Sequence, residues 1–472
     1  MSSRRDFMKG VVLTAGAFLS SLRRGNAQQE GHGIEHQERQ LKASRAGTGY
    51  LPVETPDIPK MPWTKENGVK VFHITAEVVK TEFIPGKQVY AWGYNGSVPG
   101  PTIEVMEGDR CRFILHNKLP EPTTMHWHGF EIPISMDGMP YISQPLIMPG
   151  ESFVYEFTVH QKGTFFYHSH MAMQEMMGMI GLFIMHPKKE FQPKVDKDFG
   201  LILQEWALLP NNPIPNTLSM EFNWLTLNGK AGPATTPMIV KLGERVRIRF
   251  VNLGMDHHPM HLHGNTFYTT GTEGGRVPQA AWTPANTVLV GVAQARDVEF
   301  DAIYPGDWMI HCHLPHHMMN QMVSMVGPMT HLGHGMHSGM GMEEGMGMIR
   351  EGSAMDEEFG ASMGRALGVG STYEESVGHL VGQKQTEHSQ HQMGADQTDP
   401  KKVPGYPQDM VMFMDEAVEK PETYGLAKNW TGGMMGMMSL IRVLEPELYE
   451  KVKKLQAEGR KKQESSGPHK HG

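Results

Sequence analysis

The 472-residue chain lacks features that several protein classes require. Its only two cysteines are Cys111 and Cys312, so the sequence indicates neither a disulfide framework nor a covalent haem motif. The net charge is modestly negative at -8, and no dense basic block lies outside the two end segments, which argues against nucleic acid as a partner. No apolar run is long enough to span a membrane. The chain is instead rich in methionine, with 39, and in histidine, with 26.

The most informative segment is His311-Cys312-His313, which is followed by His317 and Met322. Successive side chains of a strand point to opposite faces, so Cys312 faces one way and its two neighbours face the other. A thiolate, two imidazoles and a distant thioether are the ligands of a blue-copper site. Cys312, His317 and Met322 supply three of those four ligands, which leaves the two flanking histidines for a second metal site.

Three other segments carry histidines at a spacing that places two side chains on one strand face. In the segment 258–264, His261 and His263 share a face whereas His258 need not, so we assign His258 to the blue-copper site. The other two segments supply one pair each, and His311 and His313 form the fourth pair. The four pairs provide eight histidines, which suits a cluster of three metals. The pairs are His126 and His128, His168 and His170, His261 and His263, and His311 and His313.

In chain order these segments read HWHG, HSH, HPMHLHG and HCHLPHHMMNQM, and they resemble the four motifs of the multicopper oxidase family. The resemblance runs from about Val69 to Pro328 and implies four copper ions for each chain. The implied type 1 ligands are His258, Cys312, His317 and Met322. The implied type 2 ligands are His126 and His261, and the implied type 3 ligands are His128, His168, His170, His263, His311 and His313.

The stretch between His170 and His258 is short, so the chain resembles the two-domain, small laccase-like subgroup of the family. That resemblance implies an all-β fold of two cupredoxin-like β-sandwich domains, which we expect at 65–190 and 195–330. Short runs broken by Gly and Pro turns fit strands of such domains; they lie at 69–79, 102–115, 152–159 and 246–251. The remaining expected segments are a signal peptide at 1–27, an arm at 28–64, a flexible Met/His/Gly-rich segment at 331–404 and a partly helical extension at 405–472.

Outside the motifs, the N-terminal pair Arg4-Arg5 precedes an apolar stretch and a small-residue ending at Ala27, which is typical of a twin-arginine export signal to the periplasm. The methionines at 171–179 fit core packing slightly better than Cu(I) ligation. Those recurring at 331–404 favour a copper-collecting segment over an inert linker. At 434–455 apolar residues at helical spacing predict a short helical pair, with a Cu(I) handle as the alternative.

The function implied by the resemblance is the one-electron oxidation of a phenol, Cu(I) or Fe(II), coupled to reduction of dioxygen to water, either laccase-like or in copper detoxification. It further implies a homotrimer whose neighbouring chains complete the cluster. Asp137 would relay protons, although an Asp-Gly pair is often only a turn. Two alternatives stay open: periplasmic copper sequestration, and a copper nitrite reductase, which needs a first-domain cysteine where this chain has Ser169.

Overall fold

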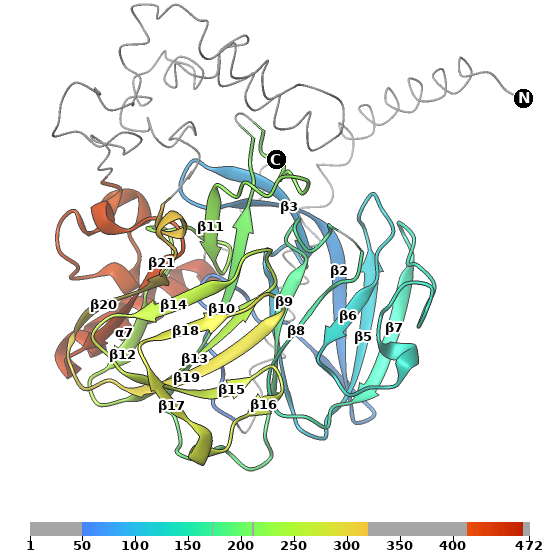
Figure 1. Ribbon diagram of the computed structural model, residues 1–472, viewed down its shortest axis with the longest axis horizontal. Helices are drawn as coiled ribbons and strands as arrows, with labels where there is room; N and C mark the ends of the chain where they lie inside the picture. The colour runs from blue at the N-terminus through green and yellow to red at the C-terminus, as the bar shows by residue number, and fades with distance from the viewer. Residues whose placement is uncertain (1–49, 172, 210–211, 320–412, 466–472) are drawn as a thin grey trace, which may run out of the picture.

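The structure is a computed structural model that describes residues 50–171, 173–209, 212–319 and 413–465. Within these ranges it contains strands β1 to β21, six short 3₁₀ helices and one α-helix, α7 at Pro446–Ser465 (Figure 1). The expected signal peptide, Met322 and the segment 331–404 lie outside the described residues. No helix in the described ranges is long and apolar enough to cross a membrane.

The first sandwich packs a five-stranded sheet against a four-stranded sheet. Its core is rich in aromatic side chains, among them Phe113 and Trp127, whose ring centroids lie 4.3 Å apart. The larger sheet holds β1 (Thr64–Glu66), β2 (Val69–Glu82), β3 (Gln88–Tyr94), β5 (Arg110–Asn117) and β7 (Ser152–Thr158). The smaller holds β4 (Gly100–Met106), β6 (Met125–His128), β8 (Gly163–Ser169) and β9 (Ile180–His186).

The run 102–115 forms two strands, β4 and β5, in different sheets instead of one continuous strand. Gly108 lies between them with φ +92°, in the left-handed region that glycine enters at low cost. The side chain of Asp109 accepts a hydrogen bond from the Met106 N–H at 2.7 Å, which stabilises this turn. The alternation of apolar residues on either side of Gly108 therefore belongs to two sheets that face each other.

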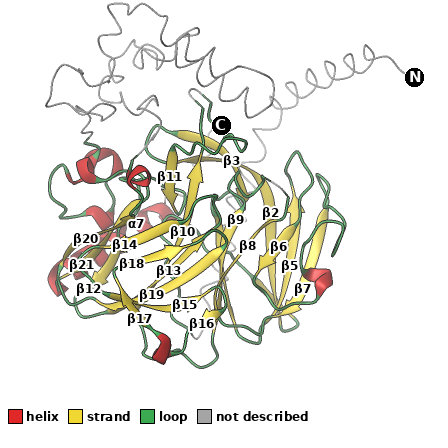
Figure 2. Cartoon of the chain, in the orientation of Figure 1, coloured by secondary structure: helices red, strands yellow, loops and turns green. Residues whose placement is uncertain are grey.

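The second sandwich has the same two-sheet plan and a core of aliphatic side chains that includes Ile248 and Ile310. One sheet holds β10 (Lys197–Trp206), β11 (Trp224–Leu227), β13 (Arg245–Asn252), β15 (Phe267–Thr272), β16 (Gly275–Arg276), β17 (Thr283–Ala285) and β19 (Gln294–Asp301). The other holds β12 (Met238–Lys241), β14 (His258–Leu262), β18 (Thr287–Val290), β20 (Gly306–Cys312) and β21 (Met438–Leu444). The prediction of an all-β, two-sandwich protein with a C-terminal helix is confirmed (Figure 2).

Strand β21 corrects the expected organisation of the C-terminal part. We expected the second domain to end at residue 330 and residues 434–455 to be helical, but β21 lies inside the sheet, parallel to β12 and antiparallel to β20. All seven of its residues are buried. A strand buried on both faces reads as a continuous apolar run, which periodicity does not distinguish from a buried helix. Within 434–455, the helical residues are those of α7, which packs Val452 against Leu444 of β21.

Apolar contacts join the two sandwiches. Phe166 and Leu182, on β8 and β9 of the first sandwich, belong to one buried cluster with Ile202 and Val251, on β10 and β13 of the second. Because the cluster draws on the outer faces of both sandwiches, it fixes one sheet against the other. The relative position of the two sandwiches is thus set by packed side chains and not only by the connecting chain.

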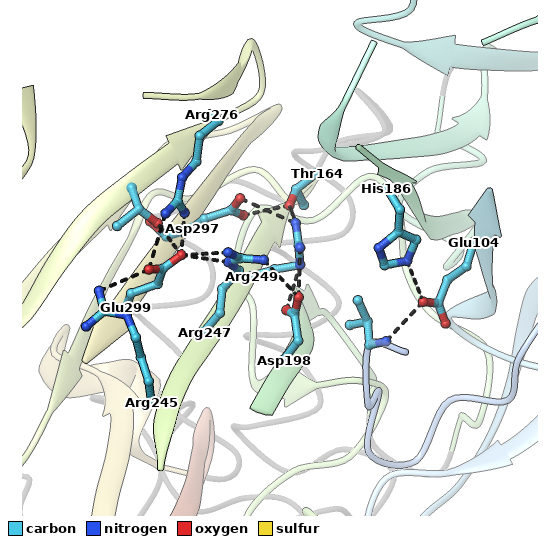
Figure 3. A network of polar contacts seen from close by, with 12 residues as sticks. Glu104, Thr164, His186, Asp198, Arg245, Arg247, Arg249, Arg276, Asp297 and Glu299 are labelled. Carbon is cyan, nitrogen blue, oxygen red and sulfur yellow. Dashed lines mark hydrogen bonds and ion pairs between the residues drawn. The ribbon is translucent and has the colours of Figure 1, made fainter. Parts of the chain in front are cut away.

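A buried network of charges lies beside this apolar cluster (Figure 3). Strand β13 alternates apolar residues, which enter the core of the second sandwich, with Arg245, Arg247 and Arg249 on the face toward the first. Arg249 binds both carboxylate oxygens of Asp198, at 2.7 and 2.8 Å. It also donates to the Thr164 hydroxyl, on β8 of the first sandwich, at 2.7 Å. The arginine therefore links the two sandwiches while it neutralises a buried acid.

The two acids nearest Arg249 differ in how well they are paired. Burial raises the pKa of Asp198, but the charges of Arg249 and Arg247 outweigh burial and hold that pKa below its usual range. Asp297 has one longer contact with Arg249, at 3.4 Å, and a hydrogen bond from Thr164 at 2.6 Å. For Asp297, burial prevails and raises the pKa. Arg249 is thus the main positive charge beside Asp198, whereas Asp297 is less well compensated.

Candidate metal centres

Three donor atoms converge inside the second sandwich, and we call His258, Cys312 and His317 the cysteine group. The two histidine Nδ1 atoms lie 3.1 Å apart. The Cys312 Sγ lies 3.4 Å from Nδ1 of His317 and 3.7 Å from Nδ1 of His258. All three side chains are buried. A buried cluster of one thiol and two imidazoles that face one another is suited to a metal ion.

The elements that hold the cysteine group come from distant parts of the chain. His258 begins β14 and Cys312 ends β20, and these two strands are hydrogen-bonded neighbours. His317 lies in a 3₁₀ helix at Pro315–Met318. The Met437 backbone then closes the loop, because its carbonyl accepts from the Cys312 N–H at 3.0 Å and its N–H donates to the His317 carbonyl at 2.8 Å. The segment preceding β21 therefore fixes both ends of the ligand loop.

A second group of donors stands on the outer side of the same two strands. Ligand atoms of His261, His263 and His311 lie within 4.8 Å of one another, and Nε2 of His263 lies 3.1 Å from Nε2 of His311. The ring of His313 lies 5.4 Å from that of His261. We call these four residues the second-domain histidine group. As strand alternation predicts, Cys312 is in the core while His311 belongs to the other group.

A matching group lies in the first sandwich. Ligand atoms of His126, His128 and His168 lie within 4.8 Å of one another, because β6 and β8 pair with His126 opposite His168. The ring of His170 lies 5.2 Å from that of His126. These four residues form the first-domain histidine group. All eight histidines predicted for the cluster are thus arranged in two sets of four, one set on each sandwich.

Backbone carbonyls fix which nitrogen several of these histidines present to a metal. Nδ1 of His126 lies 2.7 Å from the Asp137 carbonyl oxygen, Nδ1 of His261 lies 2.8 Å from that of Asn286, and Nδ1 of His311 lies 2.9 Å from that of Cys312. A carbonyl only accepts, so Nδ1 carries the proton and Nε2 keeps its lone pair for a metal. The Asp137 carboxylate is farther away, 3.6 Å from Nδ1 of His126.

The surroundings keep several of these side chains uncharged in the absence of a metal. Burial and the nearby imidazole of His168 lower the pKa of His128 to about 4. Burial and His258 likewise lower the pKa of His317 to about 4. Burial raises the pKa of the Cys312 thiol to about 12. Neutral imidazoles are ready to bind a metal, whereas the thiol must release its proton when a metal binds.

The two histidine groups do not form one site within the described part of the chain. They are distinct clusters of ligand atoms, and Figure 1 shows β6 in one half of the view with β14 and β20 in the other. His263 and His313 are exposed, and His126, His128 and His170 are partly exposed. Each group therefore lies at the surface of its own sandwich, with some of its imidazoles exposed.

Both sandwiches match family models that are described as multicopper oxidase. The first match covers residues 75–190 and the second covers residues 208–328, which together make up half of the chain. The chain belongs to the multicopper oxidase family. This confirms the resemblance drawn from the four histidine motifs, and the two matched segments agree with the two-domain subgroup. Copper is therefore the cofactor of this protein, and its relatives are oxidoreductases.

Relatives of this multicopper oxidase include copper resistance protein A of Pseudomonas syringae pv. tomato, which is 38% identical over 124 residues, 26% of this chain and 20% of that protein. Multicopper oxidase mco of Staphylococcus aureus is 31% identical over 231 residues, 46% of this chain and 50% of that protein. The crystal structure of blue copper oxidase from Nitrosomonas europaea is 32% identical, with a TM-score of 0.49, over 53% of this chain and 81% of that chain. The chain thus spans between a fifth and a half of these two curated relatives.

The donor set of the cysteine group fits copper. One ion bound to imidazole nitrogen and thiolate sulfur at about 2.0–2.3 Å holds those atoms roughly 3.3–3.8 Å apart. The three observed separations, from 3.1 to 3.7 Å, are close to that range. A thiolate with two imidazoles is also the ligand set that selects a blue-copper ion. The expected axial ligand, Met322, lies outside the described residues.

Three carboxylates beside the histidines were not predicted from the sequence. Glu175 lies 3.0 Å from Nδ1 of His168, Asp256 lies 3.5 Å from Nε2 of His317, and Glu205 lies 3.2 Å from Nε2 of His258. Of the three, only Glu205 stands out in the sequence, because it is the one charged residue between positions 199 and 220. Among the methionines at 171–179, Met177 and Met179 are buried, whereas Met173 is exposed.

Proposed function

We propose that this multicopper oxidase couples the one-electron oxidation of a reductant, a phenol, Cu(I) or Fe(II), to the four-electron reduction of dioxygen to water. The observation that carries this proposal is the position of Cys312 and His311 in one strand. The Cys312 Sγ belongs to the buried cysteine group, and the adjacent His311 belongs to the second-domain histidine group. Two metal sites are thus joined by a single peptide unit, a link that metal storage does not require.

Bound copper ions would supply one-electron transfer at the cysteine group and dioxygen reduction at the histidine groups. The protein's own contribution is to hold donors in place and to exclude water from the electron-accepting end. Cys312 and His258 are completely buried there. His317 reaches toward the surface through its Nε2, which lies 3.5 Å from the 43% exposed Asp256. His317 is thus the ligand through which an external reductant would deliver electrons.

Proton supply would involve Asp137, whose carboxylate lies 3.6 Å from Nδ1 of His126 and is 32% exposed. That exposure allows exchange of protons with solvent while the backbone carbonyl of the same residue orients His126. Inside the HCH motif, Leu314-Pro315-His316 provides no carboxylate. We therefore assign proton delivery to Asp137 on the first-sandwich side of the cluster.

We further propose that four coppers are bound for each chain and that the three-copper cluster forms between neighbouring chains of a head-to-tail trimer. Two features support this: the two histidine groups lie on different sandwiches, and both are open at the surface. A ring of heterologous contacts would place the first-domain group of one chain on the second-domain group of the next. Export to the periplasm remains part of the proposal, since its signal at 1–27 lies outside the described residues.

Dioxygen uptake tests the function. The copper-loaded protein with excess electron-rich phenol should consume four donor electrons for each dioxygen and release no peroxide. Cys312→Ser should reduce uptake to the background rate, because the path from the cysteine group to His311 runs through that sulfur. Cys111→Ala is the matched control, since Cys111 is a buried thiol in the core of the first sandwich, and it should retain uptake. No uptake by the fully loaded protein would instead favour copper sequestration.

Mixing two inactive variants tests the shared cluster. His126→Ala damages only the first-domain group and His261→Ala only the second-domain group. In a ring trimer, subunits reassembled from an equal mixture restore one intact site in every mixed ring, so about a quarter of the wild-type activity should return. Co-expression from two tagged genes allows the mixed rings to be isolated. If the cluster formed within one chain, every ring would remain inactive.

The first sandwich argues against a nitrite reductase. That enzyme needs a first-domain cysteine, and the position between His168 and His170 is Ser169. Ser169 is fully buried, and its hydroxyl lies 2.7 Å from the side-chain oxygen of Gln174. Cys111 is on β5 in the core, away from the histidine strands β6 and β8. The first sandwich therefore has no thiolate to offer to a second blue-copper ion.

A further inference from the structure

Glu205 is a carboxylate buried beside the cysteine group. It lies near the end of β10, in the sheet that faces the β14–β20 sheet of the same sandwich, and its side chain is 0% exposed. Its only ion-pair partner among the described residues is His258. Burying a carboxylate without a cation is costly unless its oxygens are hydrogen-bonded or a positive charge lies nearby. The position of Glu205 therefore requires an explanation.

Hydrogen bonds account for the orientation of this carboxylate. One oxygen accepts from the backbone N–H groups of Met255 and Asp256, the latter at 2.7 Å. The other oxygen lies 3.2 Å from Nε2 of His258. A Cβ at position 254 would overlap the carboxylate, so Gly254 is what allows the loop to approach it. The loop that precedes β14 is thus folded around Glu205, and the carboxylate faces a single imidazole.

The protonation of His258 follows from this contact. Its Nδ1 faces the Cys312 sulfur and Nδ1 of His317, so Nδ1 is the atom that a metal would take. Nε2 must then carry the proton, which it donates to Glu205. A carboxylate acceptor on the far nitrogen of a ligating histidine fixes the ring and increases the electron density on the ligating nitrogen. Negative charge close to the site also favours the more highly charged metal ion.

We propose that Glu205 is a positioning residue that lowers the reduction potential of the copper held by the cysteine group. This inference rests on copper binding there, as in the proposed function. Through His258, the carboxylate stabilises Cu(II) over Cu(I). The effect is strong because Glu205 is fully buried and is not screened by water or salt. By contrast, Asp256 contacts the other imidazole, that of His317, from a position that is 43% exposed.

The test compares two neutral substitutions that keep side-chain shape. Glu205→Gln should raise the potential, with about a tenfold increase in the equilibrium constant for reduction by a fixed redox partner, equal to 59 mV for one electron. Asp256→Asn, which removes the same charge beside the other imidazole, should change that constant less. The readouts are a spectroelectrochemical titration of the copper-loaded full chain and its visible cysteine-to-copper absorption, which should persist in both variants.

A second variant tests the same contact without removing the charge. Gly254→Ala displaces the Glu205 carboxylate from His258 and should also raise the potential. The proposal is overturned if Glu205→Gln shifts the potential no more than Asp256→Asn does, or if it abolishes the absorption while Gly254→Ala leaves the potential unchanged. A wild-type protein without the visible absorption would contradict copper binding at the cysteine group itself, which is a failure of the proposed function and is recognised before any variant is made.

Discussion

A chain that ends at residue 412 should fail to form its second sandwich. Strand β21 lies between β12 and β20, and its Ile441 is registered with Met238 on one side and with Trp308 on the other. Removing it exposes both neighbours and the core that Ile441 and Val443 enter. It also removes the Met437 backbone that holds the Cys312 and His317 loop. We expect insoluble protein, or a soluble first sandwich with an unfolded second half.

The control is an internal deletion of 331–404, which keeps 413–472 and leaves 19 residues to connect Met319 to Phe413. Such a linker can span up to roughly 60 Å. The Met414 N–H donates to the Thr431 hydroxyl at 2.8 Å, and Gly436, a few residues after Thr431, lies close to Met319, so the gap is well within that reach. Soluble yield, near-ultraviolet circular dichroism and the visible absorption of the copper-loaded protein should match the full chain. Retention of that absorption by the chain ending at 412 would contradict the role given to β21. The internal deletion also isolates any contribution of 331–404 to Cu(I) oxidation.

Replacing Arg249 by methionine should destabilise the protein by about 3–5 kcal/mol, the range for removing one partner of a buried ion pair. Asp198 would lose the partner that makes two hydrogen bonds to it and would keep only the ion pair with Arg247, at 3.1 Å. Asp297 and Thr164 would lose their contact with the guanidinium group. Because Thr164 belongs to the first sandwich, the separation of the two sandwiches should accompany the loss of stability.

Chemical denaturation of the full chain measures this effect. Arg110→Met is the matched control, because Arg110 pairs with Glu156 at 2.8 Å but its side chain is 64% exposed, and exposed pairs contribute at most about 1 kcal/mol. Arg249→Met combined with Asp198→Asn should recover part of the loss, since the buried charge is then removed. Equal effects of Arg249→Met and Arg110→Met would show that the network is not important for stability.

The sequence was sufficient to single out the histidine and cysteine side chains that converge in the structure, because chemistry restricts the residue types that bind copper. Few residue types bind copper, and the alternation of a strand separates Cys312 from His311 and His313 without knowledge of the tertiary structure. The same reasoning paired His261 with His263 and set His258 apart, and the structure places these residues in two groups accordingly. The two sandwiches were also accessible, because the family resemblance and the short strand runs agree.

Other features depend on which surfaces meet, and no local pattern reports that. Strand β13 alternates arginine with apolar residues, which indicates two different faces but not that the arginine face meets another sandwich instead of water. All seven residues of β21 are buried, so its sequence shows no hydrophobic periodicity that would distinguish a strand from a helix. Its partner β20 ends more than a hundred residues earlier, so sequence proximity gave no hint of the pairing.

The late position of Met437 has a consequence for the order of biosynthesis. The backbone of Cys312 finds its hydrogen-bond acceptor only in a residue that is translated more than a hundred positions later. Until the ribosome has passed β21, the cysteine ligand is part of an edge strand, and its loop to His317 is not yet closed. If the cysteine group holds copper as proposed, copper capture there would report that the chain has been made at least as far as residue 444, and a prematurely terminated product should stay colourless.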